Sequence, residues 1–98
     1  SATGDAAIVA ALRALLAVEL ASLAAELQPA VENGDTVTAC DRLHRLRAAC
    51  GFCGANALDT AGDALRAALN QPTETRAVAW RKFAEAISAT SAALAALD

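Results

Sequence analysis

The chain has 98 residues, of which 56% are apolar and only 3% aromatic, and its formal net charge is −3. A chain of this length builds one modest core, so we expect a single domain over residues 1–98. The mild charge leaves no basic stripe to displace counterions from a nucleic-acid backbone, which argues against a nucleic-acid partner. Three cysteines at irregular spacing argue against a disulfide framework and favour a reducing, cytoplasmic location.

Charged residues interrupt the most apolar segment, at Arg13, Glu19 and Glu26, so we expect no membrane-spanning helix. No secretory signal pattern opens the chain. The first residue is Ser1 rather than Met, so we expect a processed start or an excised module. Together these features predict a cytoplasmic domain that does not insert into a membrane.

Helices are the expected elements throughout the chain. Alanine is the commonest residue and the best intrinsic helix former, and no stretch alternates apolar and polar residues at period two. Turn-forming residues interrupt the chain at 33–35, around Gly54 and at 70–73. We therefore expect helices over about 6–32, 36–53, 55–70 and 73–97.

Each expected helix carries one apolar stripe at the helical period. Pro29 lies inside the first stripe and should kink or end that helix. Asp35 and Thr73 are expected to cap the second and fourth helices. Four amphipathic helices with short connections predict an all-α, antiparallel four-helix bundle with up-down-up-down connectivity. The expected inner faces are Val9, Leu12, Leu16, Leu20, Leu23, Leu27 and Val31; Leu43, Leu46, Cys50 and Cys53; Leu58, Ala61, Gly62, Leu65, Ala68 and Leu69; and Trp80, Phe83, Ile87, Leu94 and Leu97.

His44 is the only histidine, and on the second helix it lies away from the apolar stripe. On a helical wheel, Arg47, Ala48 and Gly51 lie within roughly 60° of it, so small side chains and one cation surround the imidazole. Gly51 costs the helix about 1 kcal/mol relative to alanine. Because the neighbouring side chains are small, another protein could bring a reactive group close to the imidazole, which favours a docking surface here. A surface histidine without a role is the alternative.

The run from His44 to Ala55 resembles the signature of histidine phosphotransfer domains. That signature has a histidine, any residue, a leucine, a lysine or arginine, a glycine and then small residues, and it ends in glycine-alanine. The matching positions are His44, Leu46, Arg47, Gly54 and Ala55.

Further positions extend the resemblance over essentially the whole chain. Ala49 and Cys50 stand where the family favours small residues, and Gly34-Asp35 matches its turn ahead of the active helix. Ala48 departs from the pattern, because the family usually has glycine there. Alanine is the smallest substitute, so this departure bears on the fit of a partner rather than on docking itself.

The resemblance implies a phosphorelay intermediate, in which His44 accepts a phosphoryl group from a receiver-domain aspartate and passes it to another receiver. Neutral imidazole is a competent nucleophile, and Arg47, one turn along, is placed to donate charge-assisted hydrogen bonds to phosphoryl oxygens. The sequence has no Gly-rich phosphate loop, so we expect no kinase activity and no cofactor of its own. By resemblance, the receiver supplies Mg²⁺.

The expected partners are receiver domains of response regulators and, in cis, a sensor kinase. The chain would be free-standing or the last module of a hybrid sensor kinase at the cytoplasmic face of the inner membrane, and we expect a monomer. Phe52 lies about 80° from His44 on the helical wheel, so it either contacts the partner or covers the end of the helical bundle. The expected docking residues are Cys40, Asp41, Arg45, Ala48, Gly51, Phe52 and Ala55.

Three other interpretations compete with phosphotransfer. Cys50 and Cys53 have the spacing of a redox pair, but the βαβ context is missing and the wheel turns both sulfurs towards the core. A zinc site built from these two with Cys40 and His44 is disfavoured, because His44 and Cys50 are about 9 Å apart along the helix. We therefore expect no metal. A helical adaptor or dimerisation module, with His44 incidental, shares the fold and differs only at the site.

Overall fold

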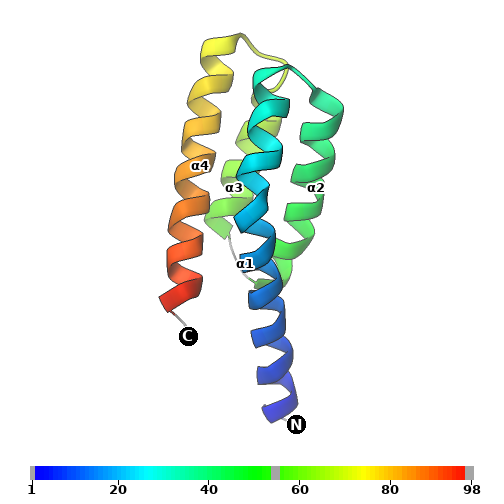
Figure 1. The fold of residues 1–98 in the computed structure, drawn as a ribbon, viewed down its shortest axis with the longest axis vertical. Coiled ribbons are helices and arrows are strands. Elements are labelled where there is room, and N and C mark those ends of the chain that lie inside the picture. The colour runs from blue at the N-terminus through cyan, green and yellow to red at the C-terminus, as the bar shows by residue number, and fades with distance from the viewer. Residues whose placement is uncertain (1, 54–55, 97–98) are drawn as a thin grey trace.

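The computed structural model describes residues 2–53 and 56–96, and among them the side chains of residues 6–48 and 56–96. The described chain is helical apart from short turns and contains no strand, so the all-α class is confirmed. The helices are α1 (Ala2–Glu32), α2 (Thr36–Cys53), α3 (Asn56–Ala68) and α4 (Thr73–Ala96), as Figure 1 shows.

The helices begin and end close to the expected residues, with differences at α1 and α3. α1 begins at Ala2 rather than near residue 6. α3 ends at Ala68 rather than near residue 70. Here the Leu69 N–H donates to the Arg66 carbonyl at 3.3 Å and the Gln71 N–H to the Ala68 carbonyl at 3.0 Å. These shorter-range bonds tighten the chain after α3 into a turn.

α1 ends at Glu32, within one turn of Pro29 and at the residue expected from the sequence. The Pro29 carbonyl accepts a hydrogen bond from the Asn33 N–H at 2.9 Å. A proline in the last turn lacks the N–H that would donate to the carbonyl four residues earlier, but its own carbonyl can still accept a hydrogen bond. The remaining bonds of the last turn still form, and α1 ends at the glycine that follows.

Gly34 and Asp35 end α1 and begin α2. Gly34 has a φ of 70°, in the left-handed region. Its N–H donates to the Val31 carbonyl at 3.3 Å, and the Asp35 N–H donates to the Ala30 carbonyl at 2.8 Å, which together form a Schellman motif. Asp35 Oδ1 then accepts from the Thr38 N–H at 3.2 Å, so the expected cap of α2 is confirmed. Hydrogen bonds from the side chain and backbone of Thr38 lower the pKa of Asp35.

The start of α4 differs from the expected cap. Thr73 is the first residue of the helix, and the Pro72 carbonyl accepts its first hydrogen bond, from the Arg76 N–H at 3.1 Å. The Thr73 hydroxyl accepts from Arg76 Nη2 at 3.3 Å. Proline at this point fixes φ and the turn ahead of the helix, so the threonine side chain is free to hold Arg76.

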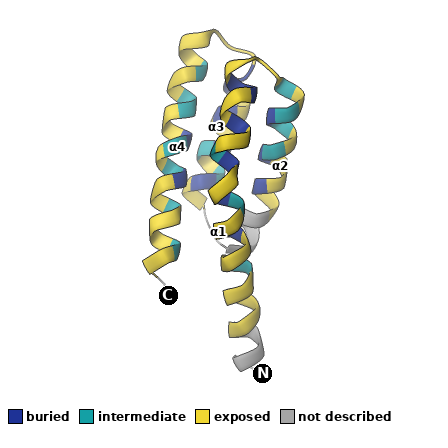
Figure 2. Cartoon of the chain, in the orientation of Figure 1, coloured by how far each residue is buried: buried dark blue, intermediate teal, exposed yellow. Residues whose placement is uncertain are grey.

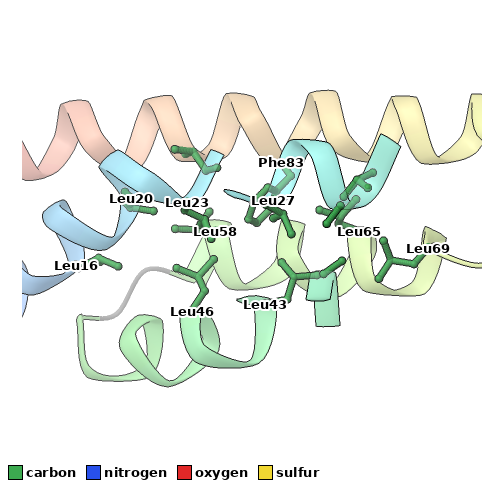
Figure 3. Close-up of a cluster of buried hydrophobic side chains, with 14 residues drawn as sticks. Leu16, Leu20, Leu23, Leu27, Leu43, Leu46, Leu58, Leu65, Leu69 and Phe83 are labelled. Atoms are coloured by element: carbon green, nitrogen blue, oxygen red, sulfur yellow. The ribbon is translucent and has the colours of Figure 1, made fainter. Parts of the chain in front are cut away.

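The four helices pack side by side around one core (Figure 1). α1 contacts α2 and α4, and α3 contacts the same two helices, whereas α1 and α3 do not approach each other within the described residues. They therefore occupy opposite corners of the bundle-like fold. Figure 3 shows the core, which consists of Leu16, Leu20, Leu23, Leu27, Ala30, Val31, Ala39, Leu43, Leu46, Leu58, Leu65, Leu69, Phe83 and Ile87.

The predicted inner faces are buried where a neighbouring helix covers them. The exception on α1 is its N-terminal part, which extends past the ends of the other helices and is exposed (Figures 1 and 2). Val9 is exposed and Leu12 half-buried, although both continue the inner stripe. On α4, Trp80 and Leu94 are half-buried. The side chains of Cys50, Cys53 and Leu97 lie outside the described part.

α1 is long and apolar enough over Ala6–Glu32 to span a membrane, judged by length and composition alone. The segment contains four charged residues, Arg13, Glu19, Glu26 and Glu32, and still meets that criterion, so the absence of a membrane-spanning helix stays a prediction. The inner face of the same helix is packed against α2 and α4. Length and composition do not separate a membrane segment from the core helix of a soluble protein.

Candidate functional site

α2 presents His44 to solvent. Leu43 and Leu46, on either side of it in sequence, are buried in the core, and the rotation that buries them turns the imidazole outward. His44 and Arg47 are both exposed, as the helical wheel predicts. The ring is therefore accessible to a group carried by another molecule.

A small cavity lies beside His44, between α2 and α3. Its volume is about 20 Å³, which is enough for one water molecule. Its lining combines leucines of the core with charged residues of both helices. The lining residues are Leu43, His44, Leu46 and Arg47 from α2, and Leu58, Asp59, Gly62, Asp63 and Arg66 from α3.

Two carboxylates on α3 face Arg47. Arg47 Nη1 lies 3.6 Å from Asp63 Oδ1, and Arg47 Nε lies 4.0 Å from Asp59 Oδ1. The Arg47 side chain is 58% exposed, so water screens both ion pairs and each contributes at most about 1 kcal/mol. The two pairs place the guanidinium beside the cavity, and they are weak enough for it to leave.

The sequence did not reveal this role of α3. Asp59 and Asp63 lie outside the apolar stripe of their helix, and the sequence alone does not say which cation they meet. Their four-residue spacing puts both on one face, which is the signal that could have pointed to a shared partner. Which cation they meet depends on how α2 and α3 are rotated against each other.

A second group of charges lies one turn before His44, around Asp41. Its Oδ2 lies 3.3 Å from Arg42 Nη1 and 3.4 Å from Arg45 Nη2. Arg42 Nε also lies 3.2 Å from Glu26 Oε2 on α1, so Arg42 joins α2 to α1. Asp41 and Arg45 remain exposed beside His44.

The other expected docking residues differ in their exposure, and some of them lie outside the described part. Ala48 is exposed. Cys40 is a half-buried free thiol that packs against the core, so it offers a partner little surface. The side chains of Gly51 and Phe52, and the whole of Ala55, lie outside the described part.

The competing cysteine chemistry depends on residues that are largely not described. The side chains of Cys50 and Cys53 fall outside the described part, so the redox pair stays a hypothesis. Among the side chains that are described, no three metal-binding groups gather into a site. Cys40 and His44 are one turn apart on α2, but the first packs against the core and the second faces solvent.

No family model, curated protein or solved structure matches the chain. The resemblance to histidine phosphotransfer domains therefore depends on the sequence motif around His44. The chemistry must be judged from the site itself: an exposed imidazole, a guanidinium one turn along the same helix, and two carboxylates facing that guanidinium from the neighbouring helix.

Proposed function

We propose that this chain is a histidine phosphotransfer domain, a phosphorelay intermediate in which His44 is the phosphoryl acceptor and donor. The observation that carries the proposal is the exposed imidazole of His44 beside the exposed guanidinium of Arg47, at the mouth of the α2–α3 cavity. In this proposal the four helices form the antiparallel up-down-up-down bundle typical of that family.

The transfer is a displacement at phosphorus. The unprotonated ring nitrogen of His44 attacks the phosphorus of an aspartyl phosphate on the receiver, and an N–P bond forms. The P–O bond to the aspartate breaks, and the aspartate leaves as a carboxylate with the bonding electrons. Donation to a second receiver is the same step in reverse. By resemblance, the receiver supplies Mg²⁺, which neutralises charge on the phosphoryl oxygens.

Arg47 is the group of this chain best placed to stabilise the phosphoryl group. Its guanidinium donates charge-assisted hydrogen bonds, which are stronger than neutral ones. Leaving Asp59 and Asp63 costs little, because those exposed pairs contribute at most about 1 kcal/mol each. The phosphoryl group on His44 then competes with the two carboxylates for Arg47, and this competition adjusts how long the phosphoryl group is retained.

The surface around His44 has the small side chains and the charges that docking of a receiver domain needs. Ala48 leaves a low surface next to the ring. Asp41, one turn before His44, and Arg45, directly after it, place opposite charges on either side in sequence. Charges at such a rim favour the correct partner and orientation more than they add affinity. The partners would be cytoplasmic receiver domains, with a sensor kinase in cis if the chain is one module of a hybrid kinase.

Transfer of label from a receiver tests the proposal. A panel of receiver domains is charged with radiolabelled acetyl phosphate, freed of the reagent and mixed with the chain. We expect acid-labile label on the chain and none on the His44→Gln variant, whose helix content is checked by circular dichroism. Label that persists on His44→Gln, or a folded wild-type chain that no receiver labels, would refute the proposal.

A helical adaptor without phosphoryl chemistry is the second candidate. The exposed apolar side chains on α1, such as Leu15 and Val18, favour it, because such residues are typical of helix-binding surfaces. In that case partner binding would be unaffected by His44→Gln and lost when the exposed apolar residues of α1 are replaced by charged ones.

A further inference from the structure

α1 carries a second apolar stripe that the core does not use. Ile8, Leu15 and Val18 are 60%, 65% and 70% exposed, although all three are large and apolar. On a helical wheel they lie roughly 90–170° from the centre of the buried stripe of the same helix, so they lie outside the face that packs against α2 and α4. Single exposed apolar residues are ordinary, but a continuous stripe of them indicates a surface that another molecule covers.

The spacing of this stripe is that of a helix-to-helix seam. Ile8, Ala11, Leu15, Val18, Ser22 and Ala25 follow one another at alternating steps of three and four residues, and all six are exposed. That alternation averages 3.5 residues and is the pattern of the two core positions in a coiled coil. A lipid-facing helix has no need of such a period. We call these six residues the outer seam.

The polar member of the outer seam is compatible with burial. The Ser22 hydroxyl donates to the Glu19 carbonyl of its own helix at 3.3 Å. A hydroxyl that is already bonded within its helix can enter an apolar interface without being left unpaired.

The chain exposes more surface than a compact monomer of its size. Its accessible surface is 6009 Å², whereas a monomer of 9.9 kDa is expected to expose about 5200 Å². The excess of about 800 Å² equals one partner's share of a standard protein–protein interface. The part of α1 that extends past the other helices is exposed (Figures 1 and 2).

We propose that the outer seam pairs with the outer seam of a second copy of this chain, in an antiparallel two-helix contact. In the antiparallel arrangement each outer layer contains at least one small residue: Ile8 meets Ala25 of the second copy, and Ala11 meets its Ser22. Leu15 meets Val18 of the second copy at the centre. The contact is a two-fold symmetric one, the commonest form of homodimer.

This arrangement also separates the two helical bodies. The projecting N-terminal part of each α1 lies along the part of the other α1 that packs against α2 and α4, so the bodies sit at opposite ends of the pair. The cavity beside His44 lies between α2 and α3, and α3 occupies the corner opposite α1. Both copies therefore keep His44 open. The dimer replaces the monomer expected from the sequence, and it does not depend on phosphotransfer.

The oligomeric mass in solution tests the outer seam. Sedimentation equilibrium of the 98-residue chain is expected to give twice the monomer mass of 9.9 kDa at micromolar concentrations. Leu15→Glu buries a charge at the centre of the seam twice per dimer, and we expect dimerisation to weaken by at least about tenfold. Leu15 is largely exposed, so the variant should keep its helix content.

Val37→Glu is the matched control, because Val37 is 82% exposed on α2 and lies outside the seam. This variant should remain a dimer. A wild-type chain that stays at 9.9 kDa up to 100 μM, or a Leu15→Glu variant that keeps the dimer mass, overturns the proposal. A chain that stays monomeric and binds neutral phosphatidylcholine vesicles through the outer seam also overturns the proposal, because a lipid surface rather than a second copy would then cover the seam.

Cross-linking tests the orientation. In a background with the native cysteines replaced by serine, Ile8→Cys and Ala25→Cys proteins are mixed and oxidised. The antiparallel contact predicts a disulfide between the two different variants and slow cross-linking of Leu15→Cys with itself. Rapid cross-linking of Leu15→Cys alone, with none between the mixed variants, would contradict the antiparallel arrangement.

Discussion

Gly62→Ala is predicted to stabilise the protein. Gly62 is buried in the middle of α3, where glycine costs a helix about 1 kcal/mol relative to alanine. A Cβ atom placed there would lie 3.5 Å from Phe83 Cε1 and 3.8 Å from Leu43 Cδ2, which are ordinary van der Waals distances. The added methyl group therefore fits without displacing the core.

The size of the effect follows from two contributions. Removing the backbone freedom of glycine contributes about 1 kcal/mol, and burying a methyl group contributes up to about 0.8 kcal/mol. For a domain of this size, each kcal/mol raises the melting temperature by about 4–8 °C. We therefore expect an increase of about 5–12 °C in thermal unfolding followed by circular dichroism, using the same conversion.

The control is Ala64→Gly on the exposed face of the same helix, which should lose about 1 kcal/mol for the same backbone reason. An unchanged or lower melting temperature for Gly62→Ala would refute the reasoning. It would mean that the α2–α3 spacing next to the His44 cavity requires a residue without a side chain.

Three further predictions concern the site and the α1–α2 turn. Arg47→Ala should slow phosphoryl transfer to His44 by about tenfold or more in single-turnover assays, because a charge-assisted hydrogen bond is lost. Arg47→Lys should recover part of the rate. An Arg47→Ala variant that transfers at the wild-type rate would show that Arg47 does not stabilise the phosphoryl group. Asp63→Asn should free Arg47 from its nearer carboxylate and raise the extent of phosphorylation of His44 by a factor of up to about five. The control Glu85→Gln on α4 should have no effect. A lower extent of phosphorylation in Asp63→Asn would contradict the competition between Asp63 and the phosphoryl group for Arg47. The pKa of Asp35 is lowered on folding, so its carboxylate contributes stability above the unfolded pKa, and this contribution is lost as the pH falls through the folded value. Asp35→Ala should therefore unfold at lower urea concentration than the wild type at pH 7, with the difference shrinking in acid, and a difference that is constant with pH would show that Asp35 stabilises only through its neutral contacts.

The helix pattern was largely predictable because its determinants are local. Asp35 caps α2 through a hydrogen bond three residues away, and Gly34 takes a conformation that few other residues adopt. The outward orientation of His44 follows equally from Leu43 and Leu46 beside it, since a helix that buries those two must expose the ring.

What the sequence did not predict depends on contacts between distant segments. Val9 continues the inner stripe of α1 but is exposed, because α1 extends past the described ends of the other helices at this level. Arg47 meets Asp59 and Asp63 only because α2 and α3 adopt one particular rotation. The outer seam is visible as a period in the sequence, yet it is recognised as unused only when the core is known to bury the other face.

Phosphoryl transfer to His44 is tested most directly by intact-mass spectrometry after mixing with a charged receiver. We predict the gain of one phosphoryl group, its loss after brief acid treatment, and its location on the peptide that contains His44. A wild-type chain that gains no mass from any receiver, or a phosphoryl group found on any other residue, would contradict the assignment.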